Sequence, residues 1–148
     1  MIIRPAMRSD VPEMLRLAHE APTAASWSQK EYERLFDAQP PRRTALVCEE
    51  AGTARGFLIA RIVDNEWEIE NIVIAAEVRR RRFATKLLEA FLDQARAEAA
   101  GAIFLEVRES NKAARSLYEK SGFHEAGRRV RYYSQPVEDA VLYRRSGP

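Results

Sequence analysis

The middle of the chain alternates short apolar runs with segments whose apolar residues recur at helical spacing. Residues 71–75 form a β-branched run, and a charged turn joins them to a long segment with an apolar stripe. Gly101 is expected to end that helix, and residues 102–107 predict a buried strand. A second helix then runs to Gly122. This unit predicts two parallel strands joined by a crossover helix, whose N-terminus attracts phosphate.

The flanking segments predict further strands and helices. Ser9 is expected to cap one helix, and Ser26-Trp27-Ser28 is expected to start a second that runs to Ala38. Further strands are expected at residues 2–5, 44–49, 55–63, 123–133 and 137–143. The resulting order predicts a single mixed α/β domain over residues 1–148, with a central mixed sheet of about seven strands flanked by about four helices.

Size and charge bound the possible functions. A chain of 148 residues suits one domain with its own core. Its 46% hydrophobic and 31% charged residues are ordinary for a globular protein, and no apolar run approaches the roughly 20 residues of a membrane helix. The formal net charge is only +2, which gives no global field for nucleic acid. Nucleic acid and membranes are therefore not expected partners.

The single cysteine and the start of the chain indicate a reducing compartment. Cys48 has no second cysteine to pair with and lies in an apolar run, which favours a packed strand residue over a nucleophile. The start, MIIRPAMRSD, lacks the layout of a signal peptide. His19 has no acidic or cysteine partner at metal-binding spacing. We therefore expect a cytoplasmic protein without a metal.

A set of short motifs lies in order along nearly the whole chain. They are Ser26-Trp27-Ser28, Asn71-Ile72-Val73-Ile74, the turn from Arg79 to Ala84, Leu105-Glu106-Val107-Arg108, Ser110-Asn111, Leu117-Tyr118-Glu119, Ser121-Gly122-Phe123, and Tyr132-Tyr133 followed by Glu138-Asp139-Ala140. Together, at this spacing, they resemble the GCN5-related N-acetyltransferases (GNAT), and within that family the RimI-like ribosomal-protein-alanine acetyltransferases. The resemblance implies the GNAT fold, acetyl-CoA as cosubstrate and N-acetyltransferase activity.

The resemblance also implies a strand and a turn that bind acetyl-CoA. Backbone groups of Ile72, Val73 and Ile74 would receive the pantetheine arm and thioester, although this run also fits a plain buried strand. The family's turn carries Gln or Arg, two variable residues, Gly, one variable residue, and then Gly or Ala. The turn here reads Arg79-Arg80-Arg81-Arg82-Phe83-Ala84-Thr85, with Arg82 at the position of the glycine. Such a helix start predicts a pyrophosphate site, and a solvated basic turn is the alternative.

Catalysis is expected between Glu106 and Tyr118. An α-amine with a pKa of ~8 must lose its proton before it attacks a thioester. Glu106 matches the family's proton acceptor and Tyr118 its proton donor, which implies direct transfer without a covalent enzyme intermediate. Asn111 matches a residue that holds CoA. By residue type alone, the three also fit a solvated glutamate, a packed tyrosine and a helix N-cap.

The acceptor is predicted from the same resemblance. RimI-like enzymes acetylate the N-terminal alanine of a small-subunit ribosomal protein whose first residues include arginines. Glu66, Glu68 and Glu70 share one strand face, where they either attract such a peptide or solvate an edge. Tyr132 and Tyr133 are candidate walls of a peptide groove. The alternatives are a GNAT enzyme for a small-molecule amine and, given the arginine at the motif glycine, a non-catalytic CoA-binding or interaction domain.

Overall fold

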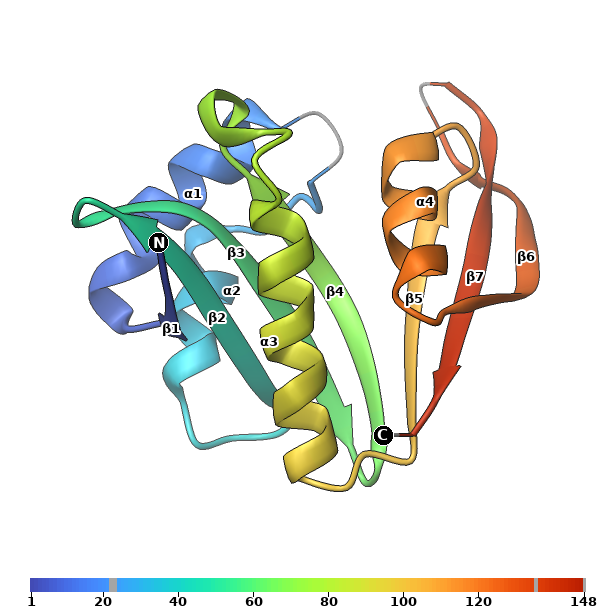
Figure 1. Ribbon diagram of the computed structural model, residues 1–148, viewed down its shortest axis with the longest axis horizontal. Helices are drawn as coiled ribbons and strands as arrows, with labels where there is room; N and C mark the ends of the chain where they lie inside the picture. Colours follow the sequence, from blue (N-terminus) through green and yellow to red (C-terminus); the bar gives the residue numbers. More distant parts are fainter. Residues whose placement is uncertain (22–23, 135, 148) are drawn as a thin grey trace.

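A seven-stranded mixed sheet runs through the molecule (Figure 1). The computed structural model describes residues 1–21, 24–134 and 136–147. The strands are β1 (Ile2–Pro5), β2 (Arg42–Glu50), β3 (Thr53–Val63), β4 (Glu66–Ile74), β5 (Ala102–Arg108), β6 (His124–Tyr133) and β7 (Glu138–Ser146). They lie in the order β1-β2-β3-β4-β5-β7-β6, with β4 and β5 parallel and all other neighbours antiparallel. This topology confirms the predicted mixed sheet.

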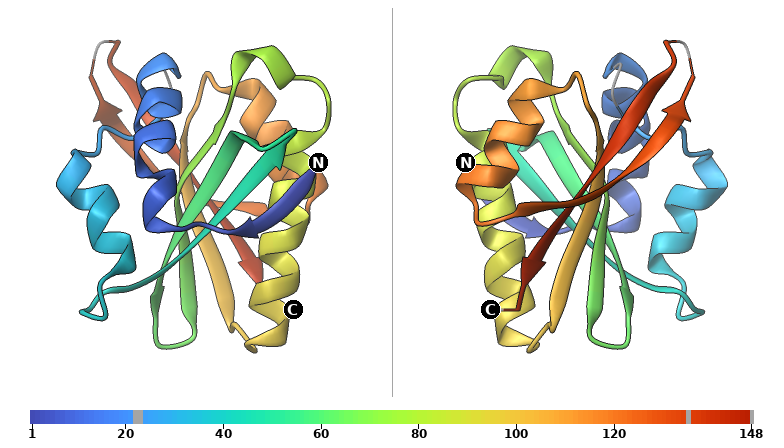
Figure 2. Two further views of the ribbon diagram at one scale, coloured as in Figure 1. Left: turned by 90° about the vertical axis from the view of Figure 1, so that its left-hand side faces the viewer. Right: turned by 90° about the vertical axis from the view of Figure 1, so that its right-hand side faces the viewer.

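Helices cover both faces of the sheet. They are α1 (Val11–Glu20), α2 (Gln29–Glu33), α3 (Phe83–Ala97) and α4 (Lys112–Lys120), with 3-10 turns at Arg8–Asp10, Arg34–Phe36 and Ala76–Val78. Figure 2 shows α1 and α2 on one face and α3 and α4 on the other. α3 is the crossover between the parallel strands β4 and β5, as predicted. None of the described helices is long and apolar enough to cross a membrane.

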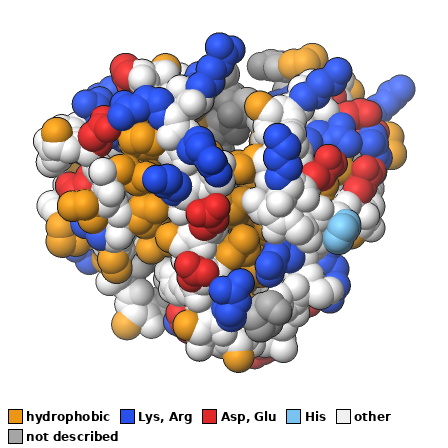
Figure 3. All heavy atoms as spheres, in the orientation of Figure 1, with side chains coloured by type: hydrophobic (Ala, Val, Ile, Leu, Met, Phe, Trp, Pro, Cys, Tyr) orange, Lys and Arg blue, Asp and Glu red, His pale blue; other side chains and the backbone are white. Residues whose placement is uncertain are grey.

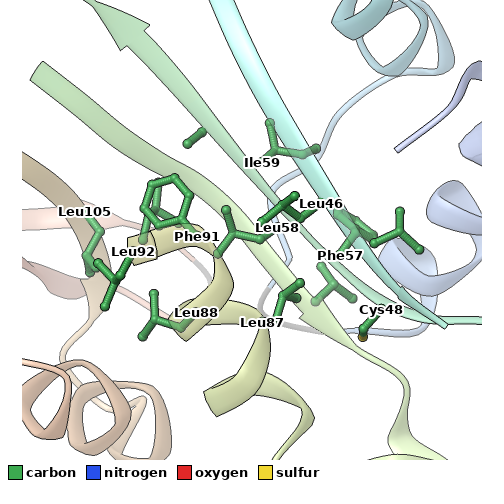
Figure 4. Packing of buried hydrophobic residues seen from close by; sticks show 14 of the residues in the cluster. Leu46, Cys48, Phe57, Leu58, Ile59, Leu87, Leu88, Phe91, Leu92 and Leu105 are labelled. Atoms are coloured by element: carbon green, nitrogen blue, oxygen red, sulfur yellow. The ribbon is translucent and has the colours of Figure 1, made fainter. Parts of the chain in front are cut away.

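The core between α3 and the sheet holds the crossover helix in place (Figure 4). Leu87, Leu88 and Phe91 are fully buried, because apolar residues three and four apart share one face of a helix. The ring centroid of Trp67, on β4, lies 5.8 Å from that of Phe91. Each large buried side chain contributes roughly 1.5–3 kcal/mol, so this stripe fixes the start of α3 beside β4.

The end of α3 differs from the sequence prediction. The helix ends at Ala97, and Ala99 takes the left-handed conformation, with φ of 57°, soon after it. Gly101, expected to end the helix, serves close packing instead, because a Cβ there would lie 2.4 Å from Nδ2 of Asn65. An alanine gives no sequence signal for a left-handed residue that ends a helix. The prediction therefore placed the helix end at the nearby glycine.

The start of α2 lies where Ser26-Trp27-Ser28 predicts it, whereas its end differs. The helix begins after Ser28, because the Ser28 hydroxyl accepts a hydrogen bond of 3.2 Å from the backbone N–H of Glu31. It continues as a 3-10 turn to Phe36 instead of reaching Ala38.

β4 and β5 pair along only part of their length. Their register stops after Ile69 of β4 and Leu105 of β5. At the same place β4 bulges, because Ile69 and Asn71 pair with consecutive residues of β3 and leave Glu70 between them. A bulge bends its strand. The outer halves of β4 and β5 consequently run apart, as Figure 1 shows.

Candidate active site

A cleft of about 580 Å³ lies between the separated ends of β4 and β5. Its walls come from the segment before α2, the outer half of β4, the turn before α3, β5, α4 and the end of β6. Among the residues predicted from the sequence, those that line it are Glu70, Ile72, Ile74, Arg79, Ala84, Glu106, Asn111, Tyr118 and Tyr133. The volume is in the range of small-molecule sites.

The β4 wall combines apolar side chains with unpaired backbone. Ile72 and Ile74 line the cleft, whereas Val73 is buried on the opposite face of the strand. Beyond Ile69, β4 stays paired with β3 and has no partner in the described residues of β5. Its backbone groups on that side are therefore available to an extended ligand.

The turn before α3 is strongly basic. Arg79, Arg80, Arg81 and Arg82 are all exposed, and Figure 3 shows Lys and Arg side chains gathered over this part of the molecule. Arg79 and Ala84 line the cleft. The first N–H groups of α3 have no acceptor within the helix, and the helix dipole adds partial positive charge. The turn therefore has the donors and the charge of an anion site.

Two side chains of this turn point away from the cleft. Arg81 is ion-paired with Glu50 at 2.5 Å, and its guanidinium lies 5.0 Å from the ring centroid of Phe83. Phe83 is itself buried in the core. These two predicted cofactor-binding residues can reach a ligand in the cleft only through their backbone.

Arg82 adopts the conformation that a glycine would adopt in its place. Its φ of 65° and ψ of 19° are left-handed, and it is the N-cap of α3. This conformation costs an L residue roughly 1–2 kcal/mol. The arginine thus keeps the shape of the turn at some cost in stability. Arg80, which also has a positive φ, Arg82 and Thr85 lie outside the residues that line the cleft.

Glu106 and Tyr118 line the cleft from β5 and α4. The Glu106 side chain is 22% exposed, and its Oε1 lies 2.8 Å from Nε of Arg129 on β6. Tyr118 is buried, with its ring centroid 5.7 Å from that of Phe123 in an edge-on contact. Burial raises the pKa of Tyr118, so the phenol is protonated at neutral pH. The cleft therefore holds a partly exposed carboxylate and a neutral hydroxyl.

Asn111 both caps α4 and lines the cleft. Its Oδ1 accepts a hydrogen bond of 3.2 Å from the backbone N–H of Ala114. This is the N-cap role, and it leaves the side-chain NH₂ group as a donor. Capping and ligand binding are therefore compatible at this residue.

The acidic face predicted along β4 is largely paired with arginines. Glu70 lines the cleft and is ion-paired with Arg43 at 2.7 Å. Glu68 lies outside the lining and is ion-paired with Arg61, also at 2.7 Å. Glu66 is exposed at the far end of the strand. Of the three, only Glu70 is placed to contact a ligand in the cleft.

The two tyrosines at the end of β6 have different positions. Tyr133 lines the cleft, with the guanidinium of Arg108 4.2 Å from its ring centroid. Burial, and then the nearby charge of Glu106, raise the pKa of Tyr133. Tyr132 lies outside the lining and is 54% exposed, with its ring centroid 5.1 Å from that of Tyr133. Tyr132 is therefore placed outside the cleft that Tyr133 helps to close.

Asn71 and Arg129 were not among the predicted site residues. Asn71 is buried in the cleft wall, where its Oδ1 accepts a hydrogen bond of 3.3 Å from the N–H of Ala25 and its Nδ2 has no partner among the described residues. A polar residue at a core-facing strand position was the available signal. Arg129 carried no signal, because its contact with Glu106 joins strands distant in sequence.

Comparison with known proteins assigns the family. A model of the acetyltransferase (GNAT) family matches residues 11–123. The [ribosomal protein bS18]-alanine N-acetyltransferase of Salmonella typhimurium is 33% identical over 136 residues, which cover 90% of this chain and 89% of that relative.

Solved structures agree with this assignment. The ribosomal-protein-S18-alanine N-acetyltransferase from Escherichia coli has a TM-score of 0.88 and 29% identity, over 98% of this chain and 92% of that one. Ard1 from Thermoplasma volcanium has a TM-score of 0.84 and 25% identity, over 98% and 96%. With the family model spanning most of its length, the chain belongs to the acetyltransferase (GNAT) family, whose members use acetyl-CoA, and it is an N-acetyltransferase.

Proposed function

We propose that the chain transfers the acetyl group of acetyl-CoA to the α-amine of the N-terminal alanine of ribosomal protein bS18. The [ribosomal protein bS18]-alanine N-acetyltransferase of Salmonella typhimurium aligns with 90% of the chain. The observation that carries the proposal is that Glu106 and Tyr118 line one cleft, together with Arg79 from the turn before α3.

The residues of the cleft fit acetyl-CoA in three places. The unpaired edge of β4 beside Ile72 and Ile74 suits the amide groups of the pantetheine arm. The first turn of α3, with Arg79, suits the pyrophosphate. Asn111 offers its side-chain NH₂ group. When bound, acetyl-CoA supplies the acetyl group as an activated thioester.

Glu106 and Tyr118 divide the proton transfers. The α-amine has a pKa of ~8, so it is mostly protonated at neutral pH and must lose a proton before its nitrogen attacks. Glu106 accepts that proton, directly or through one water. As the new N–C bond forms and the C–S bond breaks, Tyr118 donates a hydrogen bond or its proton to the departing sulfur. The second proton that the nitrogen loses goes to the thiolate, directly or by restoring the phenol. No covalent bond to the protein is needed.

In this proposal the acceptor contacts Glu70, Tyr133 and the small residues at positions 24–26, all of which line the cleft. These small side chains leave room for the start of a peptide chain. Tyr132 and Glu68 lie outside the lining, so in this proposal they contact residues further along the acceptor.

The proposal is tested by comparing two peptides. One begins Ala-Arg and has a free N-terminus, and the other has the same sequence with a blocked N-terminus and one lysine. We expect the initial rate of acetylation to be higher on the free α-amine, because the site has one base and must admit a chain terminus. Equal or faster acetylation of the lysine contradicts the assignment to an N-terminus.

Two small-molecule acceptors test the alternative that the cleft acts on a small amine. A polyamine and an amino sugar are offered under the same conditions. Their acetylation without acetylation of the free peptide would assign the cleft to a small-molecule amine.

A further inference from the structure

We propose that the Arg129 guanidinium is ion-paired with Glu106 in the enzyme without an acceptor. The ammonium group of the incoming acceptor replaces the guanidinium in this ion pair. This inference rests on the proposed function, because it takes Glu106 as the group that receives the proton of the acceptor.

The ion pair between the two side chains has the charges and the distance of the interaction that it would replace. Nε of Arg129 lies 2.8 Å from Oε1 of Glu106, the distance of a charge-assisted hydrogen bond from any nitrogen cation. The Arg129 side chain is 56% exposed and that of Glu106 is 22% exposed. Arg129 lies outside the residues that line the cleft, so its guanidinium reaches the carboxylate from the solvent side. An acceptor amine that comes from solvent meets it there.

The backbone around Arg129 is weakly held. Arg129 pairs with Ala140, and the next paired residues are Tyr133 and Glu138. Residues 130–132 of β6 therefore lie opposite residue 139 of β7, and the register between the two strands breaks there. Val130 is 75% exposed and Arg131 has a positive φ of 52°. β6 is also the edge strand of the sheet. Apart from Glu106, the Arg129 guanidinium contacts the exposed ring of Tyr132, whose centroid lies 5.4 Å away, so few contacts oppose its movement away from Glu106.

The other arginine on the Glu106 side of β5 is held differently. Arg108 is ion-paired with Glu138 at 3.0 Å and packs on the ring of Tyr133. Its side chain is only 27% exposed. Arg108 is thus fixed to the hairpin of β6 and β7, which leaves Arg129 as the cation that can be exchanged.

The exchange has a kinetic signature. An exposed ion pair is weak, so Arg129 excludes the acceptor from only part of the enzyme population. Apparent affinity falls in proportion to the fraction of binding-competent protein. Removal of the guanidinium should therefore lower the KM for the acceptor by about two- to fivefold while kcat is kept.

The test compares the wild type, Arg129→Ala, Arg129→Lys and Arg131→Ala, each with the free peptide that begins Ala-Arg as acceptor. Arg131→Ala is the matched control, because it removes the same charge from an exposed position two residues along the same strand. We expect a lower KM with unchanged kcat for Arg129→Ala, and wild-type values for Arg131→Ala and Arg129→Lys. The difference between Arg129→Ala and the wild type should shrink in high salt, because salt screens exposed ion pairs.

Three results would overturn the proposal. A lower kcat of Arg129→Ala at unchanged KM would mean that Arg129 positions Glu106. A raised KM would mean that Arg129 contacts the acceptor. Unchanged kcat and KM would mean that Arg129 takes no part in the reaction. If the wild type does not acetylate the peptide, the proposed acceptor fails, and the same variants are compared with whichever amine the wild type acetylates.

Discussion

Glu106 and Tyr118 lie in environments that suit opposite proton roles. Glu106 is partly open to solvent, so it can accept a proton and release it to water. Tyr118 is buried, and burial raises its pKa above the ordinary value. A free thiol has a pKa of about 8.5, so the phenol holds its proton more tightly than the CoA thiol does. Tyr118 is therefore expected to stabilise the departing thiolate mainly by a hydrogen bond.

Glu106→Gln should lower kcat by about 10²–10⁴-fold, because the amide keeps the shape of the side chain and cannot accept the proton. Acetyl-CoA binding, measured by calorimetric titration, should be nearly unchanged and serves as the control for folding. Wild-type turnover of this variant between pH 6 and 9 would exclude the role of Glu106 as base.

Tyr118→Phe should lower kcat by about 10–10²-fold while the thermal midpoint stays close to that of the wild type. The change removes only the hydroxyl, which makes no side-chain hydrogen bond within the described residues, and keeps the ring against Phe123. Steady-state kinetics and thermal melting check both parts. If kcat stays at the wild-type value, the hydroxyl takes no part in the departure of the thiolate.

Arg82→Gly should change stability and acetyl-CoA affinity in opposite directions. Glycine removes the strain of a left-handed arginine, so the free energy of unfolding in urea should rise by about 0.5–1 kcal/mol. Arg82 lies outside the lining of the cleft but is exposed at the start of α3, where we propose that its guanidinium binds a phosphate of acetyl-CoA. Its loss should then weaken acetyl-CoA binding by about 1–3 kcal/mol in calorimetry.

The control for this pair of effects is Arg81→Ala. Arg81 is paired with Glu50 and turned away from the cleft, so its loss should leave acetyl-CoA affinity close to that of the wild type. Equal or tighter binding by Arg82→Gly would mean that the Arg82 side chain only obstructs the site.

The order and type of the elements could be predicted from the sequence because hydrophobic periodicity is local. The unpredicted features depend on neighbours in space. The bulge at Glu70 follows from how β4 pairs with β3, and the end of α3 depends on an alanine with no local signal. The placement of Glu68 and Tyr132 outside the cleft also depends on how strands pair in space, which no local sequence pattern encodes.

The close approach of β3 and β4 predicts the effect of a small substitution. A Cβ at Gly56 would lie 2.7 Å from the backbone oxygen of Val73 and 2.7 Å from Cδ1 of Ile74. Gly56→Ala should therefore lower the free energy of unfolding by about 1–3 kcal/mol and weaken acetyl-CoA binding, because β4 must shift at the cleft.

Gly127→Ala is the matched control on β6, where the nearest atom to a new Cβ is Cδ1 of Leu142 at an ordinary 3.5 Å. Urea unfolding and calorimetry of both variants make the comparison. If the two variants have the same free energy of unfolding and the same affinity for acetyl-CoA, the spacing of β3 and β4 does not govern the acetyl-CoA site.

In the whole molecule, the cleft joins two parts that meet where β4 pairs with β5. One part supplies β4 and the turn before α3, and the other supplies β5, α4 and the end of β6. Periodicity predicted each segment, and the alternation along β5 predicted which face carries Glu106. The meeting of Glu106, Asn111 and Tyr118 in one cleft was expected only from the resemblance to the family, because no local pattern encodes a contact across the sheet.

Acetylation of the N-terminal alanine of a ribosomal protein can be measured on the intact acceptor. The most direct measurement incubates the wild-type chain with acetyl-CoA and unacetylated bS18, and locates the added acetyl group by tandem mass spectrometry. We expect one acetyl group on the α-amine of the N-terminal alanine, and almost none with Glu106→Gln. Acetyl groups only on lysine side chains, or an unmodified bS18 under conditions where the enzyme acetylates another amine, would contradict the proposed function.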